Sequence, residues 1–443
     1  MIYLDHNATS PMKPAVRTAM LEAMERIGNP SSMHRYGRLA RKHVEQARAD
    51  VAALVGVKPT QVVFTSGGTE ANNLALSAAL PESLLVFSIE HDSVLACAVG
   101  ARRIPVTQDG VVDVDAAERL FRDTCVPAHV AVMMVNNETG VIQPVAEIAR
   151  LAKAYGHKVH TDAVQAAGRL PLDFAALGVD SLTLSAHKIG GPQGMGALIV
   201  AENNVIQPHL RGGGQEMNRR AGTENVAGIL GFGAAAQLAA DDLLDAPRLR
   251  YLRDELQRCL TAIAGEGAEV IGANARTGRV ANTLLIAMKG VSSETQTMAM
   301  DLAGVAVSAG AACSSGKVKS SHVLRAMGYN ERIASSALRI SLGWSTESGD
   351  LTRCVEAWRA LYQRTRASSG PRSAAAELTL RSAAIEDNVW PILLNSTNSR
   401  PERLGHRRNC IVGCAKRVCR HGRYFAITAA RSNRCGLWIT SRV

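Results

Sequence analysis

The chain has 443 residues, of which 47% are hydrophobic and 20% charged, and its formal net charge is +11. This length accommodates two domains with sizeable buried cores. There is no uninterrupted apolar run of about 18 or more residues, so no membrane span is expected. The positive charge is concentrated in residues 371–443, which hold 13 Lys or Arg but only 4 Asp or Glu. The basicity therefore does not predict a nucleic-acid-binding surface on the rest of the chain.

The N-terminal sequence and the cysteines bear on the cellular compartment. The segment MIYLDHNATS has no basic stretch followed by an apolar core, so we expect no secretory signal and a cytoplasmic protein. The nine cysteines are an odd number scattered along the chain. This pattern favours reduced thiols over a disulfide framework.

Between residues 60 and 200 the sequence alternates short β-branched runs with helical stretches. The expected strands cover residues 61–65, 84–89, 129–135, 157–161 and 181–185. This alternation predicts a parallel sheet with right-handed crossovers. Ligands bind at the carboxyl ends of the strands in such sheets. The polar residues expected at those ends are Thr65, Ser66, Glu90, His91, Asn136, Asn137, Asp162, Ser185, His187 and Lys188.

A second, smaller α/β region follows. We expect a buried helix over residues 225–240, a helix over 247–264, strands over 280–288 and 338–343, and a helix in SHVLRAMG. The extreme N-terminus is expected to pack against this region. The predicted division is a large domain over 15–246, a small domain formed by 1–14 and 247–368, and an irregular, basic and Cys-rich tail over 369–443.

The segment TSGGTEANN, residues 65–73, has the chemistry of a phosphate cradle. A strand enters a Ser-Gly-Gly-Thr turn, and a helix begins near Glu70. Main-chain N–H groups at a helix N-terminus, together with the hydroxyls of Ser66 and Thr69, suit a phosphate. The turn lacks the Gly-Lys-Ser/Thr sequence of a nucleotide P-loop. A capped helix after a tight turn would give the same local pattern.

Three titratable residues follow neighbouring strands in a suggestive order. Lys188 stands just past a strand end, where a sheltered lysine can lose its proton and form a Schiff base. Asp162 could hold a pyridinium nitrogen, and His91 could stack on an aromatic ring or shuttle a proton. Each residue alone is equally compatible with an exposed loop lysine, a helix cap or a loop histidine. Together with the phosphate cradle they predict a pyridoxal-phosphate site.

Ten motifs along residues 1–365 resemble those of the cysteine desulfurases of the NifS/IscS class, which are fold-type I pyridoxal-phosphate enzymes. In chain order the motifs are YLDHNATSP, GNPSSMHRYGR, VVFTSGGTEANNLA, EHDSV, VNNETG, HTDAVQAAGRLPLD, SAHKIGGPQG, RRAGTEN, SAGAACSSG and ALRISLG. The resemblance implies a large domain with a mostly parallel central sheet flanked by helices, and a smaller α/β domain. It also implies that L-cysteine is the substrate and that the enzyme is a homodimer.

The resemblance assigns roles to individual residues. Lys188 forms the Schiff base and moves protons, Asp162 pairs with the pyridine nitrogen, and His91 stacks on the ring. Gln165 and Asn137 contact the phenolic oxygen of the cofactor. The phosphate is bound by Gly68, Thr69, Ser185 and His187, and by Thr223 of the neighbouring subunit. Asn137 and Arg339 bind the substrate, with the arginine on its α-carboxylate.

Cys313 lies in VSAGAACSSGKVKSSH, residues 307–322, among small residues that leave a side chain free to move. The resemblance implies that its thiolate takes sulfur from L-cysteine, releasing L-alanine and leaving a persulfide. The spacing from Cys313 to the next helix resembles the long-loop class of the family. A small hydrophobic residue at a loop turn is the alternative interpretation of this cysteine.

The destination of the sulfur and the role of the tail stay open at this stage. An iron–sulfur scaffold, nitrogenase maturation and tRNA thiolation are all possible acceptor systems, and Cys313 could transiently ligate a cluster on its partner. No resident metal site is expected, because the tail segment CIVGCAKRVC does not match common zinc or iron–sulfur spacings. Nucleic-acid binding by the Arg-rich tail is also not expected. The rival functions are a selenocysteine lyase, a class V aminotransferase, and a binding protein that works through its basic tail.

Overall fold

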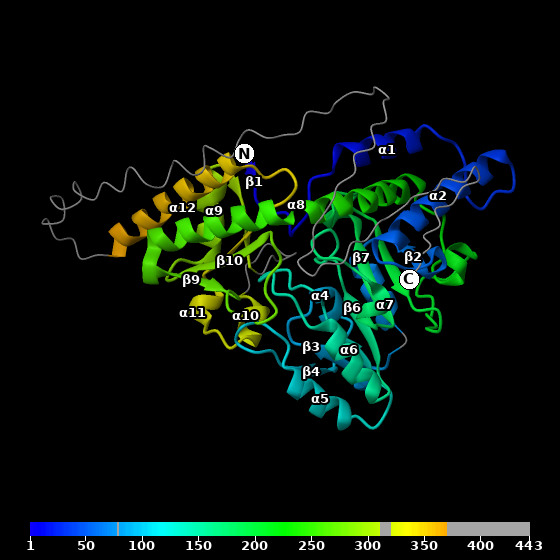
Figure 1. Ribbon diagram of the computed structural model, residues 1–443, viewed down its shortest axis with the longest axis horizontal. Coiled ribbons are helices and arrows are strands. Elements are labelled where there is room, and N and C mark those ends of the chain that lie inside the picture. The colour runs from blue at the N-terminus through cyan, green and yellow to red at the C-terminus, as the bar shows by residue number, and fades with distance from the viewer. Residues whose placement is uncertain (78, 311–319, 370–443) are drawn as a thin grey trace, which may run out of the picture. The chain divides into compact units, whose positions relative to one another are not determined.

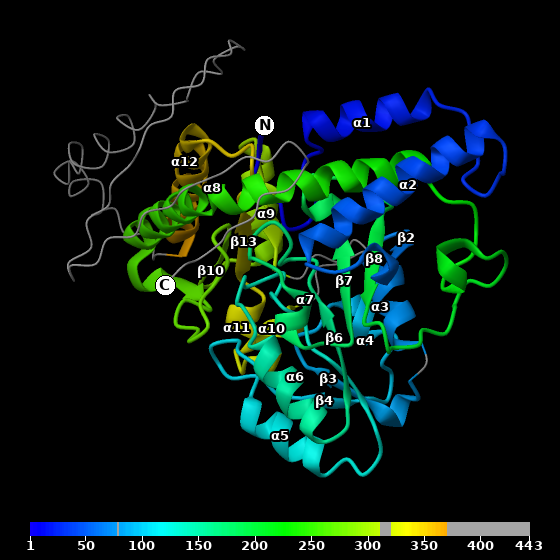
Figure 2. The same cartoon turned by 45° about the vertical axis from the view of Figure 1, so that its right-hand side comes forward.

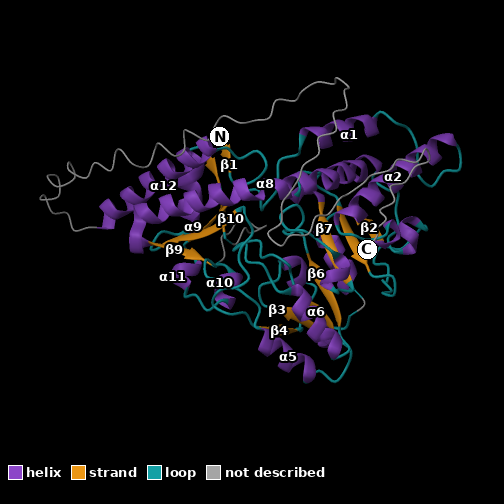
Figure 3. Cartoon of the chain, viewed as in Figure 1, coloured by secondary structure: helices purple, strands orange, loops and turns teal. Residues whose placement is uncertain are grey.

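The structure is a computed structural model, and it describes residues 1–77, 79–310 and 320–369. Cys313 and the tail predicted over residues 369–443, apart from its first residue, lie outside the described residues. The described chain contains two main sheets, each with its own hydrophobic core. Figure 3 shows the strands in these separate groups, with helices around them.

The larger sheet has seven strands in the order β2-β8-β7-β6-β5-β3-β4. Their bounds are β2 (Val62–Thr65), β3 (Leu84–Phe87), β4 (Arg102–Ile104), β5 (His129–Ala131), β6 (Lys158–Asp162), β7 (Ser181–Ser185) and β8 (Gly196–Val200). Strand β8 runs antiparallel to both of its neighbours, while the pairs from β7 to β4 are parallel. The prediction of a mostly parallel sheet is therefore confirmed.

Two strands of this sheet, β4 and β8, were not among the strands expected from the sequence. No strand was predicted over the residues of β8, although all five of them are buried. The predicted strand over 129–135 also ends early, at Ala131. The chain beyond it still follows β6, because the N–H groups of Val132 and Met134 donate to His160 and Asp162.

Helices cover the sheet and begin where the sequence supplies suitable caps. They are α1 (Pro14–Met24), α2 (Arg35–Leu54), α3 (Gly68–Leu76), α4 (Asp92–Leu95), α5 (Val114–Arg122), α6 (Val145–Ala154) and α7 (Phe174–Leu177). Helix α1 starts with proline, whose missing N–H costs nothing at that position. Helices α5 and α7 start after Asp113 and Asp173, whose carboxylates accept main-chain N–H groups of the first turn. Short 3₁₀ helices occur at Pro59–Gln61, Pro81–Ser83, Ala186–Lys188, Gln215–Asn218 and Gly265–Gly267. Figure 2 shows α3 and α6 beside the strands of this sheet.

The smaller sheet is antiparallel, in the order β12-β13-β10-β9. Its strands are β9 (Ala268–Ile271), β10 (Thr283–Met288), β12 (Ser308–Ala309) and β13 (Ala337–Ser341). The accompanying helices are α9 (Ser293–Leu302), α10 (His322–Ala326), α11 (Glu331–Ala334) and α12 (Ser348–Ser369). The N-terminal strand β1 (Ile2–Tyr3) pairs in parallel with β11 (Val305–Ala306), so the N-terminus packs against this second region.

Helix α8 (Val226–Ala264) joins the two cores. Phe232 packs in the core of the larger sheet, and Leu256 packs in that of the smaller sheet. The separate helices expected over 225–240 and 247–264 are thus one helix with Pro247 inside it. The intervening residues DDLLDA continue the helix, and Figure 1 shows it running from α2 towards α12. The predicted boundary at 246/247 falls within this helix, and the domain division remains a prediction.

By length and composition, residues 226–267 are also apolar enough to cross a membrane, with a mean hydropathy of 1.2 in the most apolar window. However, 44% of that window is buried inside the protein, and α8 packs against α1 and α2. Core helices of soluble proteins have the same character, and we interpret α8 as one of them.

Candidate functional site

The carboxyl ends of the parallel strands, the N-terminal segment and β13 surround a cavity of about 680 Å³. Most of the residues singled out from the sequence line it. They are Gly68, Thr69, His91, Asn137, Asp162, Gln165, Ser185, His187, Lys188 and Arg339. Topology explains the convergence, because parallel strands end at the same edge of a sheet.

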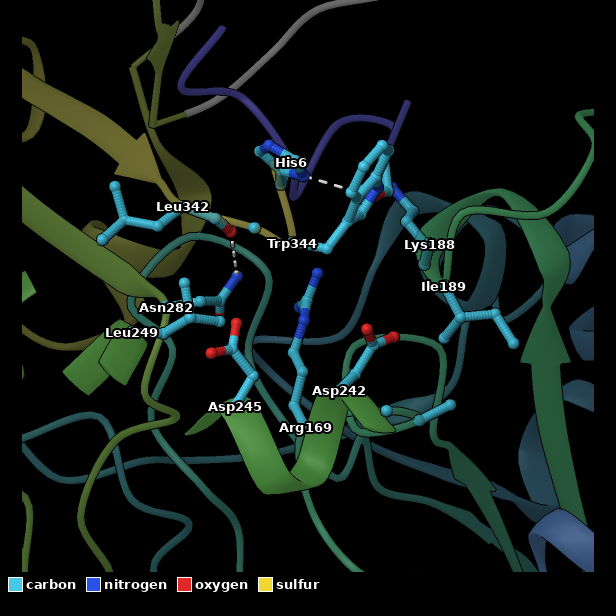
Figure 4. A pocket seen from close by; sticks show the side chains of 14 residues that line it. His6, Arg169, Lys188, Ile189, Asp242, Asp245, Leu249, Asn282, Leu342 and Trp344 are labelled. Atoms are coloured by element: carbon cyan, nitrogen blue, oxygen red, sulfur yellow. Dashed lines mark hydrogen bonds between the residues drawn. The ribbon is translucent and has the colours of Figure 1, made fainter. Parts of the chain in front are cut away.

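Lys188 ends the short 3₁₀ helix that follows β7. Its Nζ atom donates to the main-chain oxygens of Asn7, at 2.5 Å, and Ala8, at 2.7 Å. Lys188 also lines a second, smaller cavity, together with Arg169 and His6 (Figure 4). The lysine therefore stands between two cavities and is held by the N-terminal segment.

The electrostatic surroundings of Lys188 favour its neutral form. Burial, followed by the positive charges of Arg339 and Arg169, lowers the pKa of Lys188 to about 7. Asp5 and Asp162 act in the opposite direction, with smaller effects. A lysine with such a pKa has a sizeable fraction of free amine at neutral pH, which is the form that attacks a carbonyl.

Asp162 is buried at the end of β6, and its carboxylate has two donors. Its Oδ2 atom accepts from Asn72 at 2.8 Å, and its Oδ1 atom accepts from the main-chain N–H of Val164 at 2.9 Å. His91 caps α4, and its Nδ1 atom accepts from the main-chain N–H of Ser93 at 3.1 Å. Both side chains are thus oriented by neighbouring groups and line the cavity.

The phosphate cradle expected from the sequence has part of the predicted geometry. Helix α3 starts at Gly68, where an added Cβ would lie 3.1 Å from a methyl group of Val164 and 3.5 Å from Cβ of Ser185. His187 is next to a hydroxyl, with its Nδ1 atom 3.2 Å from Oγ1 of Thr9. Burial and Lys188 lower the pKa of His187 to about 4, so it is neutral at physiological pH.

Ser66 is placed differently from the expectation. Its hydroxyl donates to Oε2 of Glu70 at 2.5 Å instead of lining the cavity. Glu70 also forms an ion pair with Arg220 at 2.9 Å. Ser66 therefore stabilises the first turn of α3, and the cradle hydroxyl on this side is that of Thr69.

Arg339 reaches the cavity from β13. Its Nη2 atom donates to Oδ1 of Asp5 at 2.9 Å, and its Nη1 atom donates to the main-chain oxygen of Asn137 at 3.1 Å. Its Nε atom is buried and has no hydrogen-bond partner among the described residues. The guanidinium is thus fixed in place while keeping donor capacity for an anionic group.

Of the predicted site residues that the structure describes, one does not line the cavity. Thr223 is exposed, in the segment before α8. Cys313 lies outside the described residues, but Gly310 and Ser320, which flank its segment, both line the cavity.

Sequence reasoning missed several residues that shape the site. Asn7 bridges the two sheets, because its amide nitrogen donates to the main-chain oxygen of Asn137 and to Oγ1 of Thr283. Asn72 holds Asp162, and Asp5 holds Arg339. Asn7 and Asp5 belong to YLDHNATSP, and Asn72 belongs to SGGTEANN. The sequence therefore identified the motifs but did not assign roles to these three residues.

Comparison with known proteins places this site in a family. The family model for class-V aminotransferases matches residues 2–353. The cysteine desulfurase IscS of Dictyoglomus turgidum is 37% identical over 381 residues, which are 82% of this chain and 95% of that protein. The cysteine desulfurase of Bradyrhizobium diazoefficiens is 41% identical over 386 residues, covering 83% of this chain and 96% of that protein.

Solved structures give the same result. A NifS-like protein from Rickettsia africae superposes with a TM-score of 0.76 at 35% identity, covering 82% of this chain and 99% of that chain. SspA in complex with cysteine superposes with a TM-score of 0.66 at 27% identity, covering 77% and 99%. The chain therefore belongs to the class-V aminotransferase family. Within that family it belongs to the cysteine desulfurases of the IscS and NifS type, which confirms the predicted fold class and activity.

Proposed function

We propose that this cysteine desulfurase uses pyridoxal phosphate, takes L-cysteine as substrate and passes its sulfur to Cys313. The observation that carries the proposal is the meeting of Lys188, Asp162 and Arg339 around one cavity. These residues supply a neutral amine, a carboxylate and a fixed guanidinium. They come from β6, from the segment after β7 and from β13, so they converge only in the folded chain.

The residues at the cavity fit pyridoxal phosphate on their own chemistry. The space at Gly68 suits a phosphate group, because any side chain there would contact Val164 and Ser185. Asp162 would hold the pyridine nitrogen, Gln165 and Asn137 the phenolic oxygen, and Lys188 the aldehyde carbon. When bound, the cofactor withdraws electrons through its protonated ring and so weakens the bonds at the substrate Cα and Cβ.

Arg339 and Asn137 would orient the substrate. The free donor capacity of Arg339 suits the α-carboxylate of an amino acid, and Asp5 prevents the guanidinium from turning away. The main-chain oxygen of Asn137 itself accepts from Nη1 of Arg339, so the two residues are held side by side. This anchoring would leave the side chain of the amino acid directed towards the part of the cavity lined by Gly310 and Ser320.

Lys188 and His91 would handle protons. The Nζ atom of Lys188, with a pKa of about 7, can accept a proton from the substrate Cα and release it again at neutral pH. The Nδ1 atom of His91 accepts from Ser93, so a neutral His91 carries its proton on Nε2. That proton is available for donation.

Cys313 would take the sulfur. Its thiolate attacks the substrate sulfur, a sulfur–sulfur bond forms, and the Cβ–S bond breaks with its electron pair passing to Cβ. Cβ then gains a proton and becomes the methyl group of L-alanine. The thiol of Cys313 and L-cysteine are thus converted into a persulfide and L-alanine, and no outside oxidant or reductant is required.

The proposal includes a homodimer and a sulfur acceptor. Thr223 would bind the phosphate in the neighbouring subunit, which agrees with its exposure and with its absence from the lining of the cavity in its own chain. The persulfide would pass to an iron–sulfur scaffold or to another sulfur-acceptor protein, in the cytoplasm.

Borohydride trapping tests the cofactor assignment. The protein with bound pyridoxal phosphate is reduced, digested and examined by peptide mass spectrometry. We expect the cofactor mass on the peptide that contains Lys188, and no such adduct in Lys188→Ala. Labelling of a different lysine with equal yield would contradict the proposal.

A further inference from the structure

Asn72 lies at the centre of a buried polar network in the wall of the main cavity. The residue is 1% exposed, in the second turn of α3. Its Nδ2 atom donates to Oδ2 of Asp162 at 2.8 Å and to Oγ of Ser93 at 2.8 Å. One amide group therefore contacts both the carboxylate of β6 and the residue that orients His91.

The orientation of this amide follows from its partners. An ionised carboxylate can only accept hydrogen bonds, so the nitrogen of Asn72 must face Asp162. The Oδ1 atom of Asn72 then faces Nε2 of His160, 3.0 Å away. Because an amide oxygen only accepts, Nε2 of His160 must carry a hydrogen.

The next link fixes the tautomer of His160. Its Nδ1 atom lies 2.9 Å from Oγ of Ser181, on the neighbouring strand β7. Burial, followed by the nearby His129, lowers the pKa of His160 to about 3, so the ring is neutral. A neutral ring with a proton on Nε2 has a lone pair on Nδ1, which accepts from the hydroxyl of Ser181.

The second branch reaches His91. The hydroxyl of Ser93 accepts from Asn72, and it lies 2.9 Å from Nδ1 of His91. The main-chain N–H of Ser93 donates to the same nitrogen at 3.1 Å. Nδ1 is therefore an acceptor, and the proton of a neutral His91 is on Nε2.

We propose that Asn72 and His160 are positioning residues of a one-directional hydrogen-bond network, which sets Asp162 and His91 together for the cofactor. Its donors run from Ser181 to His160 and from His160 to Asn72, where the network divides. Successive donors aligned in one direction polarise one another, and the network ends on the negative charge of Asp162. This inference rests on the proposed function. It adds an explanation of how Asp162 and His91, the two residues expected to contact the cofactor ring, keep their positions relative to each other.

Nitrogen NMR of the histidine rings in the cofactor-free protein tests the network separately from the cofactor. We expect a neutral His160 with its proton on Nε2, and we expect the proton of His91 in its neutral form to be on Nε2 as well. A charged His160, or a neutral ring of either histidine with its proton on Nδ1, would overturn the network. Such a result would leave the proposed function intact, because the measurement is made without bound pyridoxal phosphate.

Variants of His160 test the positioning role. In His160→Gln the side-chain nitrogen can still donate to Asn72, whereas His160→Leu removes that donor. At metal sites, removal of the partners that orient the ligands costs about 10–100-fold in affinity or activity, and we use this range as a guide. We therefore expect His160→Leu to weaken pyridoxal-phosphate binding about tenfold or more, and His160→Gln to stay within about threefold of the parent.

Two further measurements separate positioning from folding. The ¹⁵N chemical shift of the pyridine nitrogen in labelled cofactor should change in His160→Leu and return in His160→Gln. His129→Leu removes a histidine from the next strand that has no hydrogen bond to Asn72, and it serves as the matched control. Equal affinity and equal shift in the Leu and Gln variants of His160 would overturn the proposal. So would an equal loss in His129→Leu.

If His160→Leu does not fold, Asn72→Asp decides the matter. It keeps the size of the side chain but replaces the donor to Asp162 with a second carboxyl. We expect weaker cofactor binding by about tenfold or more, with a changed pyridine ¹⁵N shift. Unchanged affinity and shift would overturn the proposal.

Discussion

The Nζ atom of Lys188 lies 2.5 Å from the main-chain oxygen of Asn7, and the same oxygen accepts from Nε2 of Gln165 at 3.0 Å. A residue near the start of the chain thus holds two residues that follow strands β6 and β7 of the larger sheet. The side chain of Asn7 meanwhile contacts Thr283 on β10, in the smaller sheet. The N-terminal segment therefore ties the two sheets together at the reactive lysine.

The pH dependence of cofactor capture should follow the pKa of Lys188. Burial and the two arginines lower this pKa to about 7, from its usual value of 10.5. Because the neutral amine attacks the aldehyde, capture by the cofactor-free protein should speed up about tenfold from about pH 6 to about pH 8 and then level off. Rapid-mixing absorbance measures this rate.

The same shift affects stability, and its sign can be worked out. Between about pH 7 and pH 10.5 the unfolded chain binds more protons at this lysine than the folded chain, so this group makes the cofactor-free protein more stable as pH rises. Lys188→Met should reduce that rise in a series of urea-unfolding measurements.

The rate of cofactor capture can also contradict the lowered pKa of Lys188. If that rate still climbs tenfold between about pH 8 and pH 9, Lys188 titrates as an ordinary lysine.

Arg339→Lys should raise the KM for L-cysteine while cofactor binding stays near normal. Lysine keeps the charge but loses the planar fork that pairs with a carboxylate. Hydrogen bonds to charged groups contribute about 1.5–3 kcal/mol, so we expect kcat/KM to fall roughly 10–100-fold. Steady-state kinetics with L-cysteine give the value.

Asp5→Asn is the companion variant, because it leaves Arg339 in place but weakens the contact that orients it. We expect a smaller loss of kcat/KM, in the same direction. If both variants keep the KM of the parent, the substrate carboxylate binds elsewhere.

Mixed dimers test whether Thr223 serves the neighbouring subunit. Thr223→Asp places a negative charge where the phosphate is expected, and Lys188→Ala removes the reactive amine. Each variant alone should be inactive or nearly so. A mixed dimer combines Lys188 of one subunit with Thr223 of the other, so mixing the two variants under conditions of subunit exchange should restore desulfurase activity.

Restoration would be limited to one of the two sites in each mixed dimer. Thr223→Ser should behave like the parent, because it keeps the hydroxyl. If Thr223→Asp is fully active by itself, or if the mixture stays inactive although exchange is verified, the phosphate site does not include this residue.

The strand-end residues of the site could be predicted from the sequence because their positions follow from the topology. A parallel strand that ends at Asp162 or shortly before Lys188 brings that residue to the common edge of the sheet. This placement does not depend on the conformation of the loops. The contribution of Asn7 could not be predicted this way. It is 181 positions from Lys188 in the chain, and local periodicity contains no information on such a contact.

Helix α8 and strand β8 were mispredicted for local reasons. Pro247 suggested a helix start, but the residues before it continue the helix and tertiary packing on both sides keeps it whole. Strand β8 follows a glycine-rich segment that contains Gly-Gly-Pro, and no strand was predicted there. Its pairing with both β2 and β7 depends on the complete sheet.

The central claim is that sulfur passes through Cys313, and one assay tests it directly. The protein with bound cofactor is incubated with L-cysteine and a reductant, and L-alanine and sulfide are measured together. Cys313→Ala is run beside it, with Cys125→Ala as a control at an exposed cysteine. The account predicts equal amounts of both products from the parent and from Cys125→Ala, and neither from Cys313→Ala. Full turnover by Cys313→Ala would contradict it.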